Sequence, residues 1–245
     1  MEIRQYIINC KDNSYAHFNL NREYKLAQII FNRNIEEDQE NLDYIYEQGI
    51  KISQKVHPAA ASDSLQRREL ERLQIDGVSG FLAEWCWHYF LNDLHGSDFV
   101  KFTEFRDVAY QIDLVITKNN KRIEVRSSNV RNGVKFGLCN RRYQFHIVGP
   151  YKNLVKPGEV GKDFYVMVLY PVEKKKWFSD FYNLDIVTVD LTCGANWEMM
   201  DDENIYKWET LESKDISSSI KSEYRAIPFG KSLDTFKIAQ LMNED

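Results

Sequence analysis

The chain has 245 residues, of which 43% are hydrophobic and 28% charged, the composition of an ordinary globular protein with a sizeable core. Its four cysteines show no C-x-x-C spacing, which argues against a disulfide framework or a structural zinc site and predicts a reducing compartment. The N-terminus carries charges where a secretory signal needs an apolar run, and the longest uncharged apolar run, residues 164–172, is too short to span a bilayer. We therefore expect a cytoplasmic protein with no membrane partner.

The formal net charge of −5 conceals an uneven distribution. Residues 1–116 carry a net charge of −7 and residues 177–245 one of −8, whereas residues 117–176 hold 14 Lys and Arg against 4 Asp and Glu, a net +10. A basic central segment between two acidic segments is the charge distribution expected of a protein with a phosphate-binding surface. An ordinary solvated surface with basic loops is the alternative.

The first 75 residues are predicted to be mainly helical. Apolar residues recur at helical spacing over residues 22–55. A further helix is expected over residues 65–73, ending near Gly77, because glycine favours a helix C-terminus. These patterns predict an N-terminal helical lobe or extension over residues 1–75 and a core with C-terminal elaboration over residues 76–245.

A buried helix is expected next, with Ser79 as its N-cap and its end near Gly96. Its sequence is apolar almost all round, yet Glu84 lies among its aromatic residues. A carboxylate there is costly unless a cation or hydrogen-bond donors meet it. In the alternative, Glu84 lies at an exposed edge and simply pairs with His88, one turn away.

Residues 110–128 are predicted to form a β-hairpin, because two runs rich in Ile, Val and Leu flank Asn119 and Asn120. If these asparagines are the two central residues of the turn, Asp113 faces Arg126 across the hairpin. Residues 1 to about 20 are expected as a strand or a loop, with 5–9 compatible with an edge strand. Further strands are expected over residues 99–105, 144–148, 164–172 and 185–191, a helical turn over 177–182 and a helix over 233–242.

Side chains alternate between the two faces of a hairpin, so this register separates them into an apolar face and a charged one. The charged face has two carboxylates diagonal to each other and a guanidinium beside them. A solvated polar face is common in antiparallel hairpins and needs no function. The apolar face holds Leu114, Ile116, Ile123 and Val125, and the charged face holds Asp113, Val115, Glu124 and Arg126.

The order of these residues resembles that of the PD-(D/E)XK nuclease superfamily, which has the restriction-endonuclease-like fold. In that family a helix carries a Glu, the second strand of a meander carries an Asp, and the third carries Glu/Asp-x-Lys. Glu84 matches the helix carboxylate, Asp113 the Asp, Glu124 the second acid and Arg126 the Lys position. The resemblance covers about residues 77–172.

Two positions depart from the family pattern. Ile112 stands where the family name has Pro. Arg126 stands where the family has Lys, and arginine stays protonated whereas lysine can help to deprotonate a water molecule. Arg126 could still stabilise charge that develops on the phosphate, so the change weakens a role as general base more than a catalytic role.

The resemblance implies an α/β core, with a central mixed β-sheet flanked by helices, that acts as a Mg²⁺-dependent endonuclease. The expected substrate is DNA, with RNA not excluded, and the resemblance suggests a restriction or defence enzyme acting as a homodimer. Asp113 and Glu124, with the Val125 carbonyl between them, would bind Mg²⁺, for which Mn²⁺ would substitute. Glu84 would reach the metal from the helix, and Arg126 would bind the scissile phosphate.

The basic segment after the hairpin is expected to contact the nucleic acid. Two other functions stay open from the residues alone: a nucleic-acid-binding protein of the same fold that has lost catalysis, and an interaction protein with no nucleic-acid role. The basic residues expected to bind nucleic acid are Arg131, Lys135, Arg141 and Arg142.

Overall fold

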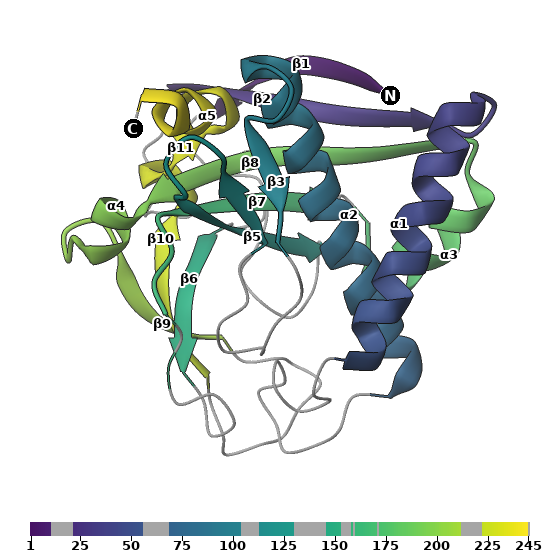
Figure 1. Cartoon of the computed structure of the whole chain (residues 1–245). Helices are drawn as coiled ribbons and strands as arrows, with labels where there is room; N and C mark the ends of the chain where they lie inside the picture. Colours follow the sequence, from purple (N-terminus) through teal and green to yellow (C-terminus); the bar gives the residue numbers. More distant parts are fainter. Residues whose placement is uncertain are drawn as a thin grey trace.

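The computed structural model of the chain shows a large mixed β-sheet between a layer of helices and a smaller sheet (Figure 1). This confirms the predicted α/β class with a central mixed sheet flanked by helices, whereas the restriction-endonuclease-like core stays a prediction. The residues that the structure describes are 1–10, 22–55, 69–103, 113–129, 146–152, 158, 160–170, 172–211 and 222–244.

The larger sheet has the strand order β1-β2-β8-β7-β5-β4-β3, and β11 pairs with β8. Of the described pairs in this sheet, β5 and β7 run parallel and the others antiparallel. Its strands are β1 (Glu2–Cys10), β2 (Arg22–Asn32), β3 (Val100–Phe102), β4 (Leu114–Ile116), β5 (Arg122–Asn129), β7 (Phe164–Tyr170), β8 (Ile186–Asn196) and β11 (Leu233–Asp234).

The smaller sheet is antiparallel, with the order β6-β10-β9, and the helices lie mainly on the opposite side of the larger sheet (Figure 1). Its strands are β6 (His146–Lys152), β9 (Lys207–Leu211) and β10 (Ser222–Pro228). The helices are α1 (Glu36–Lys55), α2 (Leu70–His95), α3 (Lys174–Asn183), α4 (Trp197–Asp201), the 3₁₀ turn η1 (Phe229–Lys231) and α5 (Thr235–Glu244).

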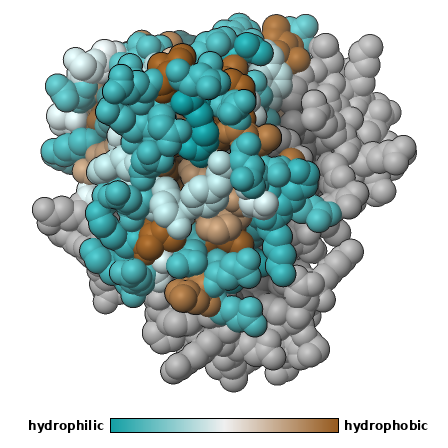
Figure 2. All heavy atoms as spheres, turned by 90° about the vertical axis from the view of Figure 1, so that its right-hand side faces the viewer, coloured by the Kyte–Doolittle hydropathy of each residue, from teal (hydrophilic) through white to brown (hydrophobic). Residues whose placement is uncertain are grey.

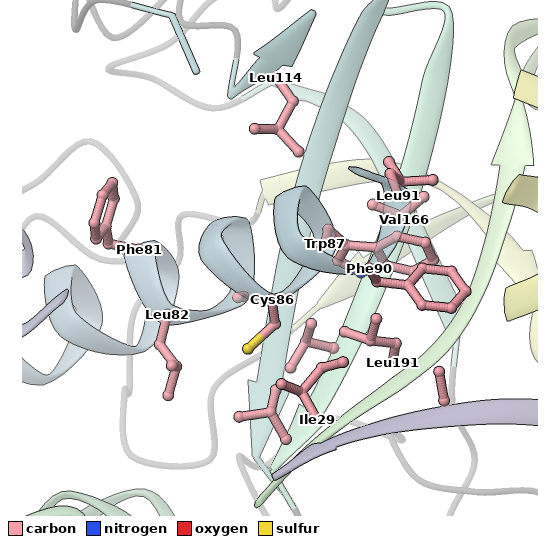
Figure 3. Packing of buried hydrophobic residues seen from close by; sticks show 14 of the residues in the cluster. Ile29, Phe81, Leu82, Cys86, Trp87, Phe90, Leu91, Leu114, Val166 and Leu191 are labelled. Carbon is pink, nitrogen blue, oxygen red and sulfur yellow. The ribbon is translucent and has the colours of Figure 1, made fainter. Parts of the chain in front are cut away.

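Strand β7 is buried on both faces, which explains its unbroken apolar sequence FYVMVLY. Val166 and Val168 face a core cluster built with α1, α2, α3 and α5. Tyr165 and Met167 face a second cluster built with β6 and β10. Figure 3 shows Trp87, Phe90 and Leu91 of α2 in the first cluster, beside Val166 and Leu191 of the sheet.

The helix predicted from residue 22 was wrong, because residues 22–32 form strand β2. Tyr24 and Leu26 pack in the second cluster, whereas Ala27, Ile29 and Phe31 pack in the first. A strand with apolar residues on both faces loses its two-residue alternation, and its sequence then resembles a helical pattern. The helix begins only with α1, whose first turn is acidic, a composition that favours a helix N-terminus.

The predicted helix end at Gly77 and N-cap at Ser79 were also wrong, because α2 is continuous from Leu70 to His95. It therefore spans residue 75, where we placed the end of the N-terminal lobe. Gly77 serves the crossing with α1: a Cβ there would lie 2.3 Å from the Gly49 carbonyl oxygen. A Cβ on Gly49 would lie 2.5 Å from the Val78 Cα, so the two glycines let the helix backbones touch.

Most other predicted elements are confirmed in the described residues. None of the described helices has the length and apolarity that crossing a membrane requires. The face over α1 and α3 is mainly hydrophilic with separate hydrophobic patches, and it offers no broad apolar surface among its described residues (Figure 2). The helix predicted over 233–242 begins only at residue 235, because 233–234 form β11. The other predicted elements match in type within the described residues: β1 for 5–9, β3 for 99–105, β6 for 144–148, β7 for 164–172, α3 for 177–182 and β8 for 185–191.

We predict that Gly77→Ala destabilises the protein by about 1–3 kcal/mol, the usual cost of overpacking. The added methyl meets a backbone oxygen, which cannot move aside without separating α1 from α2. Gly80→Ala is the matched control in the same helix, because a Cβ there has no atom within 4 Å. It should gain up to about 1 kcal/mol from helix propensity. Urea unfolding measures both, and equal effects of the two substitutions would contradict the close crossing.

Candidate active site

The predicted hairpin is present as β4 and β5, but its register differs by two residues from the prediction. Leu114 pairs with Ile123, and the Ile116 N–H donates to the Lys121 carbonyl at 2.9 Å. The reason is the turn: Asn120 has a φ of 61° and closes a loop in which its own N–H donates to the Ile116 carbonyl. This is a longer loop ending in one left-handed residue, whereas the predicted two-residue turn needs positive φ at both central positions.

A shift of two residues preserves the faces, because side chains repeat with a period of two. The apolar face is confirmed, with Leu114 and Ile123 fully buried and Val125 packed against the same cluster. Continuing the observed pairing by one residue brings Glu124 opposite Asp113, in place of the predicted Arg126. The two carboxylates are therefore closer to direct neighbours than the sequence suggested.

The charged face of the hairpin is covered rather than solvated. Asp113 is 8% exposed and Glu124 6% exposed. The parallel pairing of β5 with β7 places Glu124 beside Tyr165 and Arg126 beside Met167. Both neighbours belong to the hydrophobic cluster beneath the smaller sheet.

Asp113 lies immediately before β4, where it satisfies the backbone of the neighbouring strand. Its Oδ2 accepts a hydrogen bond from the Val125 N–H at 2.7 Å. Burial raises the pKa of Asp113 well above its usual range, and the Glu124 carboxylate raises it further. The Val125 N–H and the cations of Arg126 and Lys162 act in the opposite direction without restoring the pKa to its usual value.

Glu124 is held by two cations. Arg126 Nη2 lies 3.0 Å from Oε1, and Lys162 Nζ lies 3.7 Å from Oε2. The Lys162 side chain is only 2% exposed. Sequence reasoning missed Lys162, because a lysine beside an apolar run is usually exposed and nothing in its spacing relates it to the hairpin.

Glu84 is partly buried on α2 and lies near enough to the other two acids to feel their charges. Burial raises its pKa well above the usual range, and Asp113 and then Glu124 raise it further. In the described part of the chain, Glu84 makes no hydrogen bond or ion pair. The alternative pair with His88 is not formed, because His88 Nε2 lies 3.1 Å from Asn92 Nδ2 and its ring stacks on Phe102.

The arrangement joins three carboxylates from α2, the start of β4 and β5 with two cations. Among the described residues no group of three or more His, Cys, Asp or Glu side chains is arranged to hold a metal ion. Mg²⁺ needs only one or two protein carboxylates, because it keeps several of its water molecules. The proposed ligands are all oxygens, which suit such a hard ion. Whether an ion binds here stays a prediction.

The predicted nucleic-acid-binding residues lie outside the described residues, as does Ile112. Their contribution to the site stays a prediction. Two basic residues of the segment 117–176, Arg126 and Lys162, do lie beside the Glu124 carboxylate. The residues outside the described ranges are Arg131, Lys135, Arg141 and Arg142.

No protein-family model, curated protein or solved structure matches the chain. The resemblance to the PD-(D/E)XK nucleases therefore rests on the order and placement of the residues described above.

We predict that Glu84→Gln gains stability over the wild-type protein as the pH rises. In the unfolded chain a Glu loses its proton near pH 4.3, roughly. Folded Glu84, with its raised pKa, keeps the proton to higher pH, so the folded state binds more protons above that value. The wild-type protein therefore loses stability as the pH rises through the pKa of folded Glu84. Glutamine does not ionise, so the variant does not lose this stability.

Thermal unfolding in EDTA between about pH 4 and 8 measures this difference. The Tm of Glu84→Gln minus that of the wild type should increase with pH. Glu47→Gln is the control at an exposed position on α1, and its Tm difference should stay small. A Glu84→Gln variant that is less stable by the same amount at every pH would show a structural role for the carboxylate.

Proposed function

We propose that the protein is a metal-dependent nuclease that hydrolyses phosphodiester bonds of DNA. The observation that carries this proposal is the meeting of Glu84, Asp113 and Glu124 beside Arg126. Carboxylates beside a guanidinium are the groups needed to hold a divalent ion and to stabilise a phosphate. The three acids come from different elements of the chain, and the hydrogen bond from Val125 to Asp113 does not account for the presence of Glu84 beside them.

The electrostatics of the acids favour a bound divalent cation. The pKa values of both Asp113 and Glu84 are raised by burial and by neighbouring carboxylates, and the cations that act on Asp113 do not offset this. Glu124 already has a cation at each oxygen, which leaves Asp113 and Glu84 as the better direct ligands. The Val125 carbonyl stays a predicted ligand. A bound Mg²⁺ would neutralise phosphate oxygens and lower the pKa of a water molecule.

Arg126 is suited to bind and stabilise the phosphate, and it does not take up a proton. Its guanidinium lies 5.5 Å above the ring centre of Tyr151 and forms an ion pair with Glu124. The aromatic ring contacts one face of the guanidinium, and the carboxylate contacts its edge. A positioned guanidinium makes charge-assisted hydrogen bonds to phosphate oxygens as negative charge builds up there. The proton of the attacking water must then pass to another acceptor, because arginine stays protonated.

A nucleic-acid-binding protein without catalysis is the second candidate. It is favoured by the ion pairs at both oxygens of Glu124, which withdraw one predicted ligand from the metal. An interaction protein with a merely exposed carboxylate face has less support, because Asp113 and Glu124 are buried.

We predict that Asp113→Asn lowers DNA cleavage in Mg²⁺ or Mn²⁺ by more than about a hundredfold, since loss of a ligand should cost at least as much as loss of an outer-shell partner. The asparagine oxygen can still accept the Val125 N–H, so the fold and the DNA affinity in EDTA should be retained. A cleavage time course compares this variant with Asp93→Asn, which makes the same change at an exposed position of α2.

Undiminished cleavage by Asp113→Asn would remove the site assignment. A wild-type protein that binds DNA but cleaves neither DNA nor RNA with either ion would favour the binding protein. A wild-type protein that does not bind nucleic acid would favour the interaction protein.

A further inference from the structure

The outer face of the smaller sheet carries an exposed tryptophan. Trp208 of β9 is 52% exposed, and no other large hydrophobic side chain among the described residues of β6, β9 and β10 is exposed. Trp208 pairs with Arg225 of the central strand β10, so the two side chains share a face. Tyr224, one residue before Arg225, packs against the second core cluster, so its face points inward and the face of Trp208 points outward.

Three neighbouring side chains hold the indole of Trp208 in place. Lys152 Nζ lies 5.4 Å and Arg225 Cζ 5.6 Å from the centre of its ring. The Tyr206 ring meets the indole edge-on, with 6.2 Å between ring centres and 90° between ring planes. Cation–π and edge-to-face contacts of this kind restrict the rotation of the indole. Trp208 is therefore an aromatic surface that is both exposed and positioned.

Arg225 is engaged within the protein. Its guanidinium lies 4.9 Å from the ring centre of Tyr206 and 5.6 Å from that of Trp197, the first residue of α4. Its Nη1 donates to the Met200 carbonyl at 3.1 Å and lies 2.6 Å from Asp201 Oδ1. These contacts connect α4 to the sheet and fix the cation beside the indole, so the role of Arg225 at this surface is to support the ring.

The charged groups around the indole balance in pairs. Arg225 has Asp201 as its partner, and Lys152 Nζ lies 2.7 Å from Glu223 Oε2. Another ion pair joins two residues of β9. Each of these pairs sums to zero at neutral pH, so the contacts provide no surplus of positive charge with which to attract phosphate groups. A ligand at this surface must be recognised mainly by the aromatic ring.

The exposed aromatic area is too small for the core of a protein interface. Such interfaces bury about 800 Å² on each partner around a cluster of anchoring side chains. Here one exposed ring is surrounded by ion pairs among the described residues. A single flat ring is matched by a single flat ligand, and aromatic side chains stack on the unpaired bases of nucleic acids. In a duplex the neighbouring bases cover both faces of each base, so only an unpaired base has a face to offer.

The smaller sheet connects this surface to the candidate active site. Tyr151 of the edge strand β6 lies beneath Arg126 on the inner face of the sheet. Lys152, the next residue, contacts Trp208 on the outer face. The proposed phosphate site and the exposed indole are therefore on opposite sides of one small sheet.

We propose that Trp208 is a stacking surface for an unpaired base of the nucleic acid, which makes single-stranded segments a preferred ligand of this protein. The inference rests on the proposed function, because it requires a nucleic acid as the ligand. Lys152, Arg225 and Tyr206 position the ring, and the ring supplies the affinity. A tryptophan that served only the fold would leave the affinity for nucleic acid unchanged.

The test is the affinity for a labelled single-stranded DNA oligonucleotide in EDTA, measured by fluorescence anisotropy over a range of salt concentrations. Trp208→Leu keeps an apolar side chain but loses the aromatic face, and it should bind about fivefold or more weakly, the effect of one lost base–aromatic stack. The slope of the salt dependence should stay unchanged, because no phosphate contact is lost. The affinity for the matching blunt duplex should change by less than about twofold, well inside one tenfold step.

Two variants serve as controls. Trp208→Phe keeps an aromatic face and should retain most of the affinity for the single strand. Tyr182→Leu makes the same kind of change at a residue of α3 that is 45% exposed, and it should bind as the wild type does. A Trp208→Phe variant that binds as weakly as Trp208→Leu, with both folded by their Tm, would contradict stacking.

A double-mutant cycle between protein and ligand isolates the stack. An oligonucleotide with abasic positions keeps every phosphate but has fewer bases. Wild type should lose more affinity than Trp208→Leu when the bases are removed, and the two proteins should bind the fully abasic strand equally. An equal loss from Trp208→Leu on the normal and the abasic strand would show that the indole does not contact a base, and would overturn the proposal.

The outcomes also distinguish this inference from the proposed function. If the wild-type protein binds nucleic acid and Trp208→Leu binds single strands equally well, this inference alone is wrong and the exposed ring serves another partner, such as a protein. If the wild-type protein binds neither DNA nor RNA, the proposed function fails and the inference fails with it.

Discussion

The arrangement of charged residues at this end of the sheet depends on the buried carboxylate of Glu124. At 6% exposure it is stable only where cations or donors meet it. Arg126 meets it from the same strand, and Lys162 meets it from the segment before β7. The parallel pairing of β5 and β7 makes this possible, because it places the start of β7 beside Glu124. The strand pairing of the sheet therefore also determines which cations lie beside the Glu124 carboxylate.

The smaller sheet and helix α2 complete the site from opposite sides. The smaller sheet supplies Tyr151, whose ring lies beneath Arg126 on the charged face of the hairpin. Helix α2 supplies Glu84, which has no hydrogen-bond or ion-pair partner among the described residues. Burial raises the pKa of Glu84, and the charges of the other two acids raise it further. Shielded from water, these charges interact more strongly than they would on a surface. That shielding is the condition under which an ion or a phosphate would bind most favourably.

Much of this site follows from the period of two in β-strands. That period grouped Asp113 with Glu124 correctly although the register was wrong by two residues, because an even shift leaves each side chain on its face. The turn was mispredicted because the pair Asn119–Asn120 suits a two-residue turn with positive φ at both positions, whereas only Asn120 takes positive φ. Lys162 and the Gly49–Gly77 helix crossing depend on contacts between distant segments, which a local pattern in one sequence does not record.

The central claim is that Asp113 and Glu84 form a site short of positive charge that binds a divalent cation. Calorimetric titration of the wild-type protein and Asp113→Asn with Mn²⁺, in buffers of different ionisation enthalpy, tests it most directly. The account predicts saturable binding that releases protons, because ligands with raised pKa values must ionise. It also predicts an affinity at least about tenfold lower in the variant. Absence of saturable binding, or equal affinities without proton release, would contradict it.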